Sequence, residues 1–257
     1  MNYSASTLKP FAINYYSIEE LEKTGLVKAF YTTNKISSWK YGNGNWQQNY
    51  ALLGSIPEIS TSKMCTTFQT HTSVVRVMKE ENEGEGISKP TAVKDYDGII
   101  TNRKNFLLCS FEADCVPVYF VDPVKKAIGL SHSGWKGTAL LISKNTVEAM
   151  TKEFNTNPSD LIVAIGPCAC EKCYEVGAEL KESFEKNFDI DKIFLPKQNG
   201  KFNLDMKAAI EQTLIKAGVL QENIYSVNRC TIEASDLCSF RRTKSTVDHM
   251  LTAIMLS

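Results

Sequence analysis

Histidine is scarce in this sequence, because the 257 residues include only three. A multicopper oxidase needs a three-copper cluster in addition to a copper bound by two histidines and one cysteine, and three histidines cannot supply both. Net charge is also lacking, since 29 basic residues balance 29 acidic ones. A basic surface is the usual electrostatic signature of proteins that bind nucleic acid, so we expect no nucleic-acid partner and a small-molecule substrate instead.

Long hydrophobic runs are missing as well. The longest apolar stretches, such as residues 116–121, are much too short to span a bilayer. The first ten residues show no basic segment followed by an apolar one, so they do not resemble a secretory signal. We therefore expect a cytoplasmic protein without a membrane partner, in which the eight cysteines are reduced thiols rather than a disulfide framework.

Linkers and repeats are absent too, which bears on domain organisation. The sequence has no internal repeat and no stretch rich in glycine, serine or proline. With 257 residues, of which 43% are hydrophobic, the chain is near the upper size of one hydrophobic core. We expect residues 1–257 to form a single catalytic domain, in which the run K-E-E-N-E-G-E-G-I-S-K at 79–89 is an exposed acidic loop. The oligomeric state is left open.

Apolar periodicity predicts helices and strands in alternation. Apolar residues at helical spacing predict helices over 140–154 and 176–188. Ser17 begins an S-x-x-E capping pattern before a further helix, and Asp205 precedes another that ends at Gly218. Runs typical of strands cover 26–32, 64–68, 74–78, 98–101, 116–121, 127–130, 161–165 and 225–227. This alternation favours an α/β fold of mixed α+β layers, with mixed β-sheets flanked by helices.

Two of the three histidines lie where strand-like runs end. His71 follows the first of these runs, His132 ends another, and Cys115 lies between the two histidines in A-D-C-V-P-V. The turn-forming sequence D-P-V-K separates two runs of equal length. A hairpin closed by the pair Val121 and Lys126 would put Cys115 directly opposite His132, close enough for one metal ion to bridge them.

The chemistry of this trio has several interpretations, because the contact with His71 does not follow from spacing. Three protein ligands would leave one position of a tetrahedral zinc ion open for water or substrate, which is typical of a catalytic zinc site. Copper also binds two histidines and a cysteine. Alternatively, the residues are ordinary buried groups, or Cys115 is the nucleophile and His132 the base of a metal-free cysteine hydrolase.

At these residues the sequence resembles the YfiH-like family, long labelled laccase-domain or polyphenol oxidase proteins and now associated with purine nucleoside phosphorylase and adenosine deaminase activities. The resemblance covers roughly residues 64–242, and seven motifs in order carry it. They are Q-T-H (69–71), A-D-C-V-P-V (113–118), H-S-G-W-K-G-T (132–138), I-G-P-C…C-Y-E-V-G (165–177), N-L-D (203–205), C-T (230–231) and S-F-R-R (239–242).

The resemblance implies that His71, Cys115 and His132 bind zinc and form the catalytic centre of a mixed α/β fold distantly similar to cysteine-hydrolase-like folds. It also implies phosphorolysis of adenosine, inosine and methylthioadenosine, together with deamination of adenosine. The partners would then be a purine nucleoside and phosphate. Copper, suggested by the older family label, is the weaker alternative because of the histidine count.

Departures from the family pattern concern substrate handling. The family's T-R-x-G-G-V-S segment appears here as T-N-K-I-S at 33–37, without the arginine beside Asn34 and without the glycines. Lys136 stands where the family has arginine, which keeps the charge but loses the bidentate fork. The T-G-R that follows the double arginine is replaced by T-K-S-T at 243–246. The preferred nucleoside and the choice between phosphate and water as acceptor therefore stay open.

Four further residues are candidates for substrate binding. Gln69 has the same strand parity as His71 and could line the site. Arg241 and Arg242 could contact phosphate or a ribose hydroxyl, with surface salt bridges as the alternative. The resemblance places Cys168 near the cleft.

The same cysteine begins a C-x-C-x-x-C cluster with Cys170 and Cys173. No Cys or His pair follows at the spacing of a zinc knuckle, so we interpret these thiols as structural. Asp114 should point away from the face of Cys115, as a supporting or capping group. We interpret Trp135 as a core residue and His249 as structural. No general acid or base is assigned.

Overall fold

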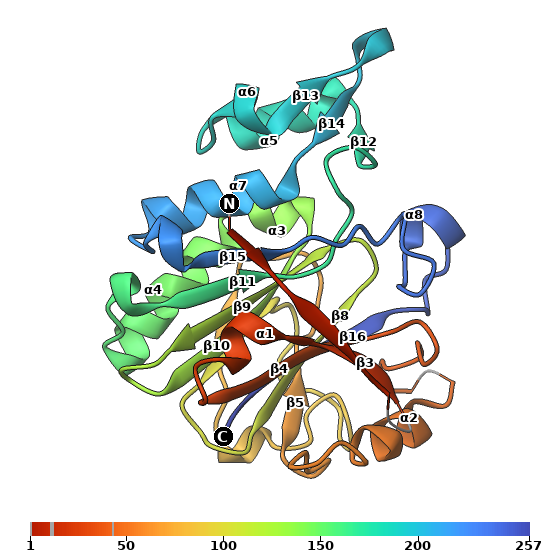
Figure 1. The fold of residues 1–257 in the computed structure, drawn as a ribbon, viewed down its shortest axis with the longest axis vertical. Coiled ribbons are helices and arrows are strands. Elements are labelled where there is room, and N and C mark those ends of the chain that lie inside the picture. Colours follow the sequence, from red (N-terminus) through yellow and green to blue (C-terminus); the bar gives the residue numbers. More distant parts are fainter. Residues whose placement is uncertain (1, 11–12, 43) are drawn as a thin grey trace.

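The computed structural model describes residues 2–10, 13–42 and 44–257, and within them the chain forms three β-sheets (Figure 1). The largest sheet has the strand order β1 (Asn2–Ser4), β15 (Ile224–Val227), β11 (Ile162–Ile165), β9 (Val116–Asp122), β10 (Ala127–Ser133), β7 (Gly98–Thr101) and β6 (Val75–Val77). The second has the order β2 (Ser6–Pro10), β3 (Asn14–Ile18), β4 (Val27–Thr32), β16 (Met250–Leu256), β8 (Leu107–Glu112) and β5 (Met64–Thr66). The third has the order β12 (Glu175–Val176), β14 (Phe202–Leu204) and β13 (Phe194–Pro196).

Short helices connect these strands. The α-helices are α1 (Glu19–Glu22), α2 (Trp46–Leu53), α3 (Trp135–Ala139), α4 (Ile142–Phe154), α5 (Lys181–Glu185), α6 (Ile190–Ile193), α7 (Met206–Lys216) and α8 (Phe240–Thr243). Single 3-10 turns cover Glu80–Asn82, Pro158–Asp160, Ala178–Leu180, Gln198–Gly200 and Gln221–Asn223. In the part of the chain that the structure describes, none of these helices has the length and apolar character that a membrane crossing needs.

The two large sheets pack face to face and enclose the central part of the core. Ile128 and Leu130 of β10 belong there to one buried cluster with Leu108 of β8 and Ile254 of β16. Fully burying each such side chain contributes about 1.5–3 kcal/mol relative to leaving it exposed. The layers therefore meet over a dry interface that fixes how the ends of β8, β9 and β10 lie relative to one another.

Helices cover the outer faces of both large sheets. Val147 of α4 and Leu214 of α7 share a buried cluster with Phe120 of the seven-stranded sheet. On the other side, Leu53 of α2 packs with Leu107 of the six-stranded sheet. The resulting order is helix, sheet, sheet, helix, and it confirms the predicted α/β fold with mixed sheets flanked by helices.

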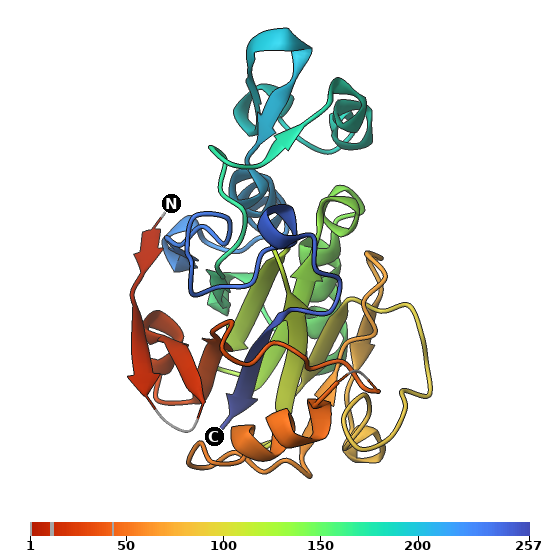
Figure 2. The same ribbon diagram turned by 90° about the vertical axis from the view of Figure 1, so that its right-hand side faces the viewer.

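The three-stranded sheet and helices α5 and α6 project from one end of the molecule, at the top of Figures 1 and 2. The single helix predicted over 176–188 is wrong, because this stretch contains the end of β12, a 3-10 turn and α5. Gly177 separates the pieces, and glycine is about 1 kcal/mol less favourable than alanine inside a helix. The periodic residues Phe184 and Phe188 are buried all the same.

Most other local predictions are confirmed. The eight predicted strands all form, and helix α7 is capped by Asp205, whose Oδ1 accepts from the main-chain N–H of Ala208 at 2.9 Å. Gly218 follows this helix with φ +95°, the left-handed conformation that glycine adopts without strain. The predicted helix over 140–154 is interrupted at Leu141, where φ is 67°, and Leu140 is exposed rather than packed in the core.

Two surface predictions are corrected. Ser17 does not cap a helix, because it pairs with Phe30 inside the second sheet and α1 begins only at Glu19. The acidic segment 79–89 is only partly exposed, since residues 84–87 are buried. Within it, Glu85 forms an ion pair of 2.6 Å with Arg76, which allows the carboxylate to be buried.

The predicted hairpin forms, but its register differs by two residues. Asp122 pairs with Ala127, so that His132 lies opposite Pro117 rather than opposite Cys115. The Asp122 side chain accepts from the main-chain N–H groups of residues 124 and 125, which moves the turn one residue along the chain. A shift of two residues preserves the face to which side chains point, so Cys115 and His132 still face the same way.

Candidate metal centre

The three residues predicted to bind a metal come from separate parts of the two large sheets. His71 lies between β5 and β6, Cys115 directly precedes β9, and His132 lies near the end of β10. One ligand atom from each lies within 4.8 Å of the other two. Cys115 Sγ is 3.8 Å from His71 Nε2, and the two imidazole rings are 4.9 Å apart and inclined at 69°. The predicted convergence of the three side chains is confirmed.

Asp97, just before β7, holds the loop that carries His71. Its carboxylate accepts hydrogen bonds from the main-chain N–H groups of Thr70, His71 and Thr72, at 3.2, 3.1 and 2.7 Å. His71 has φ 64°, a left-handed conformation that costs a non-glycine residue about 1–3 kcal/mol. The three hydrogen bonds to one buried carboxylate offset this strain and keep the imidazole at the centre.

The same carboxylate orients His132. Asp97 Oδ1 lies 2.7 Å from His132 Nδ1, which leaves Nε2 as the nitrogen that faces the other two ligands. A histidine that binds a metal usually has its second nitrogen hydrogen-bonded in this way. Burial disfavours the charged imidazole, yet Glu112, Cys115 and Asp97 outweigh it and raise the pKa of His132 well above its usual value. Burial and the nearby His132 lower the pKa of His71, so that this imidazole is available in its neutral form.

Glu112 ends β8 behind the centre and is fully buried. Its Oε1 accepts from Ser110 Oγ at 2.9 Å, whereas among the described residues Oε2 has no hydrogen-bond partner and lies 3.7 Å from His132 Nε2. Burial raises the pKa of this carboxyl group to about 8. A cation at the centre would give the orphaned oxygen an electrostatic partner, which is one reason why the residues fit a metal ion.

A glycine leaves room for that ion. A Cβ atom on Gly134 would lie 2.5 Å from His71 Cδ2 and 3.1 Å from Cys115 Sγ. The backbone at this position has φ −70° and ψ 168°, which any residue adopts, so the need for glycine is steric. The absence of a side chain here therefore allows the imidazole and the thiol to approach each other.

The centre opens into a cavity of about 330 Å³. The lining residues are Lys40, Gln69, His71, Phe111, Ala113, Cys115, His132, Phe240, Ser245, Thr246 and His249. A second cavity of about 360 Å³ shares Lys40, Gln69 and Phe111 with the first and continues past Tyr41 and Phe68. A donor set of two imidazoles and one thiol suits zinc or copper, and the adjoining cavity is large enough to admit a small molecule next to these donors.

The proposed substrate-binding residues differ in where they lie. Gln69 lines both cavities. Its side-chain amide also accepts from the main-chain N–H of Phe111 at 3.0 Å and donates to the carbonyl oxygen of Phe111 at 2.7 Å. Arg241 is on α8, with its guanidinium 5.3 Å from the ring centre of Tyr174. Cys168 is fully buried in the core beside β11 and contributes nothing to the cavity wall, and burial raises the pKa of its thiol to about 12.

The Arg242 side chain donates to main-chain carbonyl groups and does not line the cavity at the centre. Its Nη1 donates to the carbonyl oxygens of Thr231, Ile232 and Ala234, at 2.7, 3.0 and 3.0 Å, and its Nη2 donates to that of Leu237. The guanidinium thus holds the loop 231–237 in place. The sequence alone could not show whether the Arg242 guanidinium binds main-chain carbonyl groups or phosphate.

Supporting residues of the centre were only partly foreseen. Asp114 accepts from Thr231 Oγ1 and from the main-chain N–H of Arg241, which agrees with its predicted capping role. Asp97 and Glu112 were missed, although Asp97 directly precedes one apolar run and Glu112 ends another. His249 was interpreted as structural, but it lines the same cavity as the metal centre.

The fold and the centre together define a layered α/β protein in which two histidines and one cysteine converge and could hold a metal ion. Residues 25–257 match the family described as multi-copper polyphenol oxidoreductase laccase, and the chain belongs to this family. The resemblance found in the sequence is therefore confirmed.

Individual relatives carry more specific names. Purine nucleoside phosphorylase YlmD of Bacillus subtilis (strain 168) is 34% identical over 190 residues, which are 72% of this chain and 68% of that protein. Adenosine deaminase RL5, from an unknown prokaryotic organism, is 33% identical over 178 residues, 68% of each chain. The crystal structure of Bacillus licheniformis hypothetical protein YfiH matches with a TM-score of 0.89 at 28% identity, over 97% of this chain and 99% of that one.

The first prediction concerns the carboxylate of Asp97. We expect Asp97→Asn to lower the zinc affinity of the centre by about 10- to 100-fold, because an amide cannot accept all the hydrogen bonds that orient His71 and His132. Competition with a chromophoric zinc chelator measures this affinity. Asp95→Asn is the matched control, since Asp95 lies two residues before Asp97 and its carboxylate accepts from the Thr70 hydroxyl at 2.9 Å. Equal affinities of the two variants would contradict the role given to Asp97.

Proposed function

We propose that this chain is a zinc-dependent enzyme of purine nucleosides, acting through His71, Cys115 and His132. It cleaves adenosine, inosine and methylthioadenosine with phosphate, and it converts adenosine and water into inosine and ammonia. The observation that carries this proposal is a three-ligand centre that opens into a cavity, in a chain about one third identical to proteins named for these activities. Residues 1–257 would act as one catalytic domain.

The residues of the centre have two roles, metal binding and the positioning of the metal-binding side chains. His71, Cys115 and His132 would hold a zinc ion, which would supply Lewis-acid chemistry for a substrate atom or a water molecule. Asp97 holds His132 in the orientation that presents Nε2 to the ion. Asp97 also fixes the His71 loop, so the two imidazoles need little rearrangement when the ion binds.

The cavity walls suit a flat, largely apolar base. Phe111, Ala113 and Phe240 border the centre, and Tyr41 and Phe68 continue the aromatic lining in the adjoining cavity. Aromatic side chains stack on purines and exclude water from the reacting bonds. We place the purine against these side chains, with its reacting edge toward the centre.

Lys40 is the residue we propose for phosphate. It lines both cavities, and Glu112 and Cys115 are close enough to influence its pKa, which burial lowers. The family arginine missing beside Asn34 would lie only a few residues earlier in the same segment. A lysine ammonium can replace that charge as a point donor, although without the bidentate fork.

Replacing Lys40 tests this assignment. We expect Lys40→Met to raise the KM for phosphate by about ten- to a hundredfold, because the loss of a charged hydrogen bond costs about 1.5–3 kcal/mol. Adenosine deamination, which uses water, should change much less. Lys35→Met is the matched control, since Lys35 is exposed and absent from both cavity linings. An unchanged KM for phosphate in Lys40→Met would remove Lys40 from the phosphate site.

The function itself is tested by product analysis of adenosine with and without phosphate. Adenine and ribose 1-phosphate identify phosphorolysis, and inosine with ammonia identifies deamination. Metal analysis after expression without added copper identifies the ion. A zinc-loaded protein that is inert toward every purine nucleoside would overturn the proposal.

A metal-free cysteine hydrolase is the second candidate, and one observation favours it. The thiol of Cys115 is close to the imidazole of His71, and the imidazole of His132 is hydrogen-bonded to the carboxylate of Asp97. This spatial arrangement of thiol, imidazoles and carboxylate resembles a nucleophile, a base and an orienting acid. This candidate predicts full activity after treatment with a chelator and loss of activity when iodoacetamide alkylates Cys115 in the metal-free protein.

A further inference from the structure

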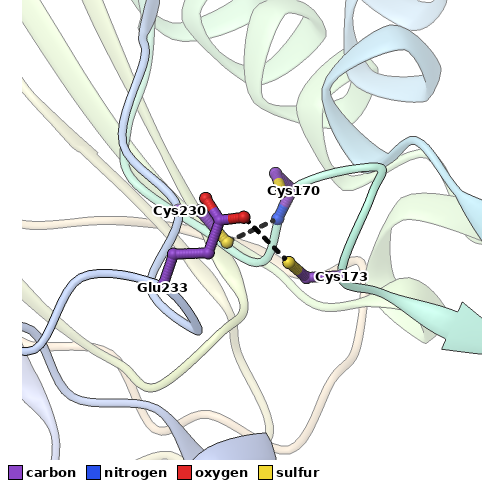
Figure 3. Close-up of side chains that lie close together, drawn as sticks. All are labelled: Cys170, Cys173, Cys230 and Glu233. Carbon is purple, nitrogen blue, oxygen red and sulfur yellow. Dashed lines mark hydrogen bonds between the residues drawn. The ribbon is translucent and has the colours of Figure 1, made fainter.

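A second group of side chains with metal-binding atoms lies outside the cavity of the proposed active site. Cys170, Cys173, Cys230 and Glu233 each offer one sulfur or oxygen atom, and these atoms all lie within 4.8 Å of one another (Figure 3). Cys173 Sγ is 3.4 Å from Glu233 Oε1. The first two cysteines follow β11 and the other two residues follow β15, so segments 60 residues apart meet here.

We propose that Cys170, Cys173, Cys230 and Glu233 form a second, structural zinc site. Zinc bonds of about 2.3 Å to sulfur and 2.1 Å to oxygen place tetrahedral ligand atoms about 3.6–3.8 Å apart. The separations in the cluster, which are at most 4.8 Å, therefore need to change by about 1 Å or less to reach these values. Thiolates select zinc over magnesium or calcium, and four protein ligands leave no position open for a substrate, which makes the site structural rather than catalytic.

A disulfide would use these side chains less well. Three thiols cannot all be paired within the group, so any disulfide leaves one thiol and the Glu233 carboxylate without a role. A zinc ion uses all four.

The main chain around the group also favours a thiolate. The N–H of Cys170 donates to Cys230 Sγ at 3.4 Å. Hydrogen bonds of this kind to ligand sulfurs are a common supporting feature of metal sites. A cavity of about 500 Å³ beside the group gives the ion a path from solvent.

The proposed structural zinc site lies next to Asp114, the residue that directly precedes Cys115. The segment before Cys170 donates from Ala169 N to the Asp114 carbonyl at 3.1 Å, and the segment after Cys230 donates from Thr231 Oγ1 to the Asp114 carboxylate at 2.7 Å. Asp114 has φ 89° and directly precedes Cys115. A zinc ion that joins the two segments thus holds Asp114 from both sides and positions Cys115 in the catalytic centre.

Metal counting tests the proposal independently of the first site. We expect the wild-type chain, purified with zinc and reductant, to contain two zinc ions, and Cys115→Ala to contain one. Adding Cys173→Ser to Cys115→Ala should remove the remaining ion and lower Tm by several degrees, since loss of a bound ion removes its contribution to folding. The Cys115→Ala background lacks a ligand of the catalytic centre, so this result stands whatever the enzyme's substrate proves to be.

A charge-only pair of variants keeps the test valid if adding Cys173→Ser makes the protein fold poorly. With cobalt in place of zinc in Cys115→Ala, we expect thiolate-to-metal absorption that changes in Glu233→Gln and stays the same in Glu171→Gln. Glu171 lines the same cavity but is not one of the four ligands. A zinc-free Cys115→Ala chain, a cobalt spectrum without thiolate bands, or a Cys170–Cys173 or Cys170–Cys230 disulfide in the reduced preparation would each overturn the proposal.

Discussion

Replacing Cys115 by alanine is expected to remove one metal ion per chain and to lower both nucleoside activities by at least about a hundredfold. Loss of a supporting residue around a metal typically costs 10- to 100-fold, and loss of a ligand should cost more. The thiolate also carries the negative charge that helps to neutralise the ion, while the two imidazoles are neutral when they bind it. Zinc content by elemental analysis and initial rates with adenosine, with and without phosphate, measure the effect.

Cys109→Ala is the control for a lost thiol. Cys109 is fully buried in β8, outside the cavity lining, so this variant should keep its metal content and its activity. If Cys115→Ala retained its full metal content but lost activity, Cys115 would act as a nucleophile rather than a ligand. If it retained both, the proposed centre would not be the site of the chemistry.

How far the sequence predicts this centre depends on the kind of contact. The pair Cys115 and His132 was predictable because both lie at the open end of one hairpin, where strand geometry makes them neighbours. The register was still wrong, since the choice between closing pairs depends on the Asp122 side chain binding the turn's N–H groups. The error did not affect the site because a shift of two residues leaves every side chain on its original face.

Contacts between residues far apart in the sequence could not be predicted from residue spacing. Asp97 holds the loop of His71 at the centre, and this contact forms because the strands that follow the two residues, β6 and β7, pair with each other. Strand β16 was not predicted, although it lies at the centre of the second sheet between β4 and β8, and His249 enters the cavity just before it. The fourth ligand of the proposed structural zinc site is a glutamate, which a search for cysteine and histidine pairs does not detect.

The second large effect is expected from a single methyl group. In Gly134→Ala the new Cβ would lie 2.5 Å from His71 Cδ2, whereas carbon atoms in contact are about 3.5–4.0 Å apart. The imidazole must therefore move by on the order of 1 Å, and metal sites tolerate only about 0.2 Å in ligand distances. We expect zinc affinity at this centre and both nucleoside activities to fall by at least about a hundredfold.

The fold should survive this substitution, because overpacking by one methyl group typically costs about 1–3 kcal/mol and the backbone at Gly134 is ordinary. Zinc titration of Gly134→Ala and a thermal unfolding curve separate the two effects. Gly54→Ala is a suitable control, since this glycine follows α2 far from the centre and its nearest neighbour is the end of the Thr61 side chain. Normal zinc affinity in Gly134→Ala would mean that His71 does not approach the ion from the side that the structure indicates, and the three-ligand centre would have to be rebuilt around other atoms.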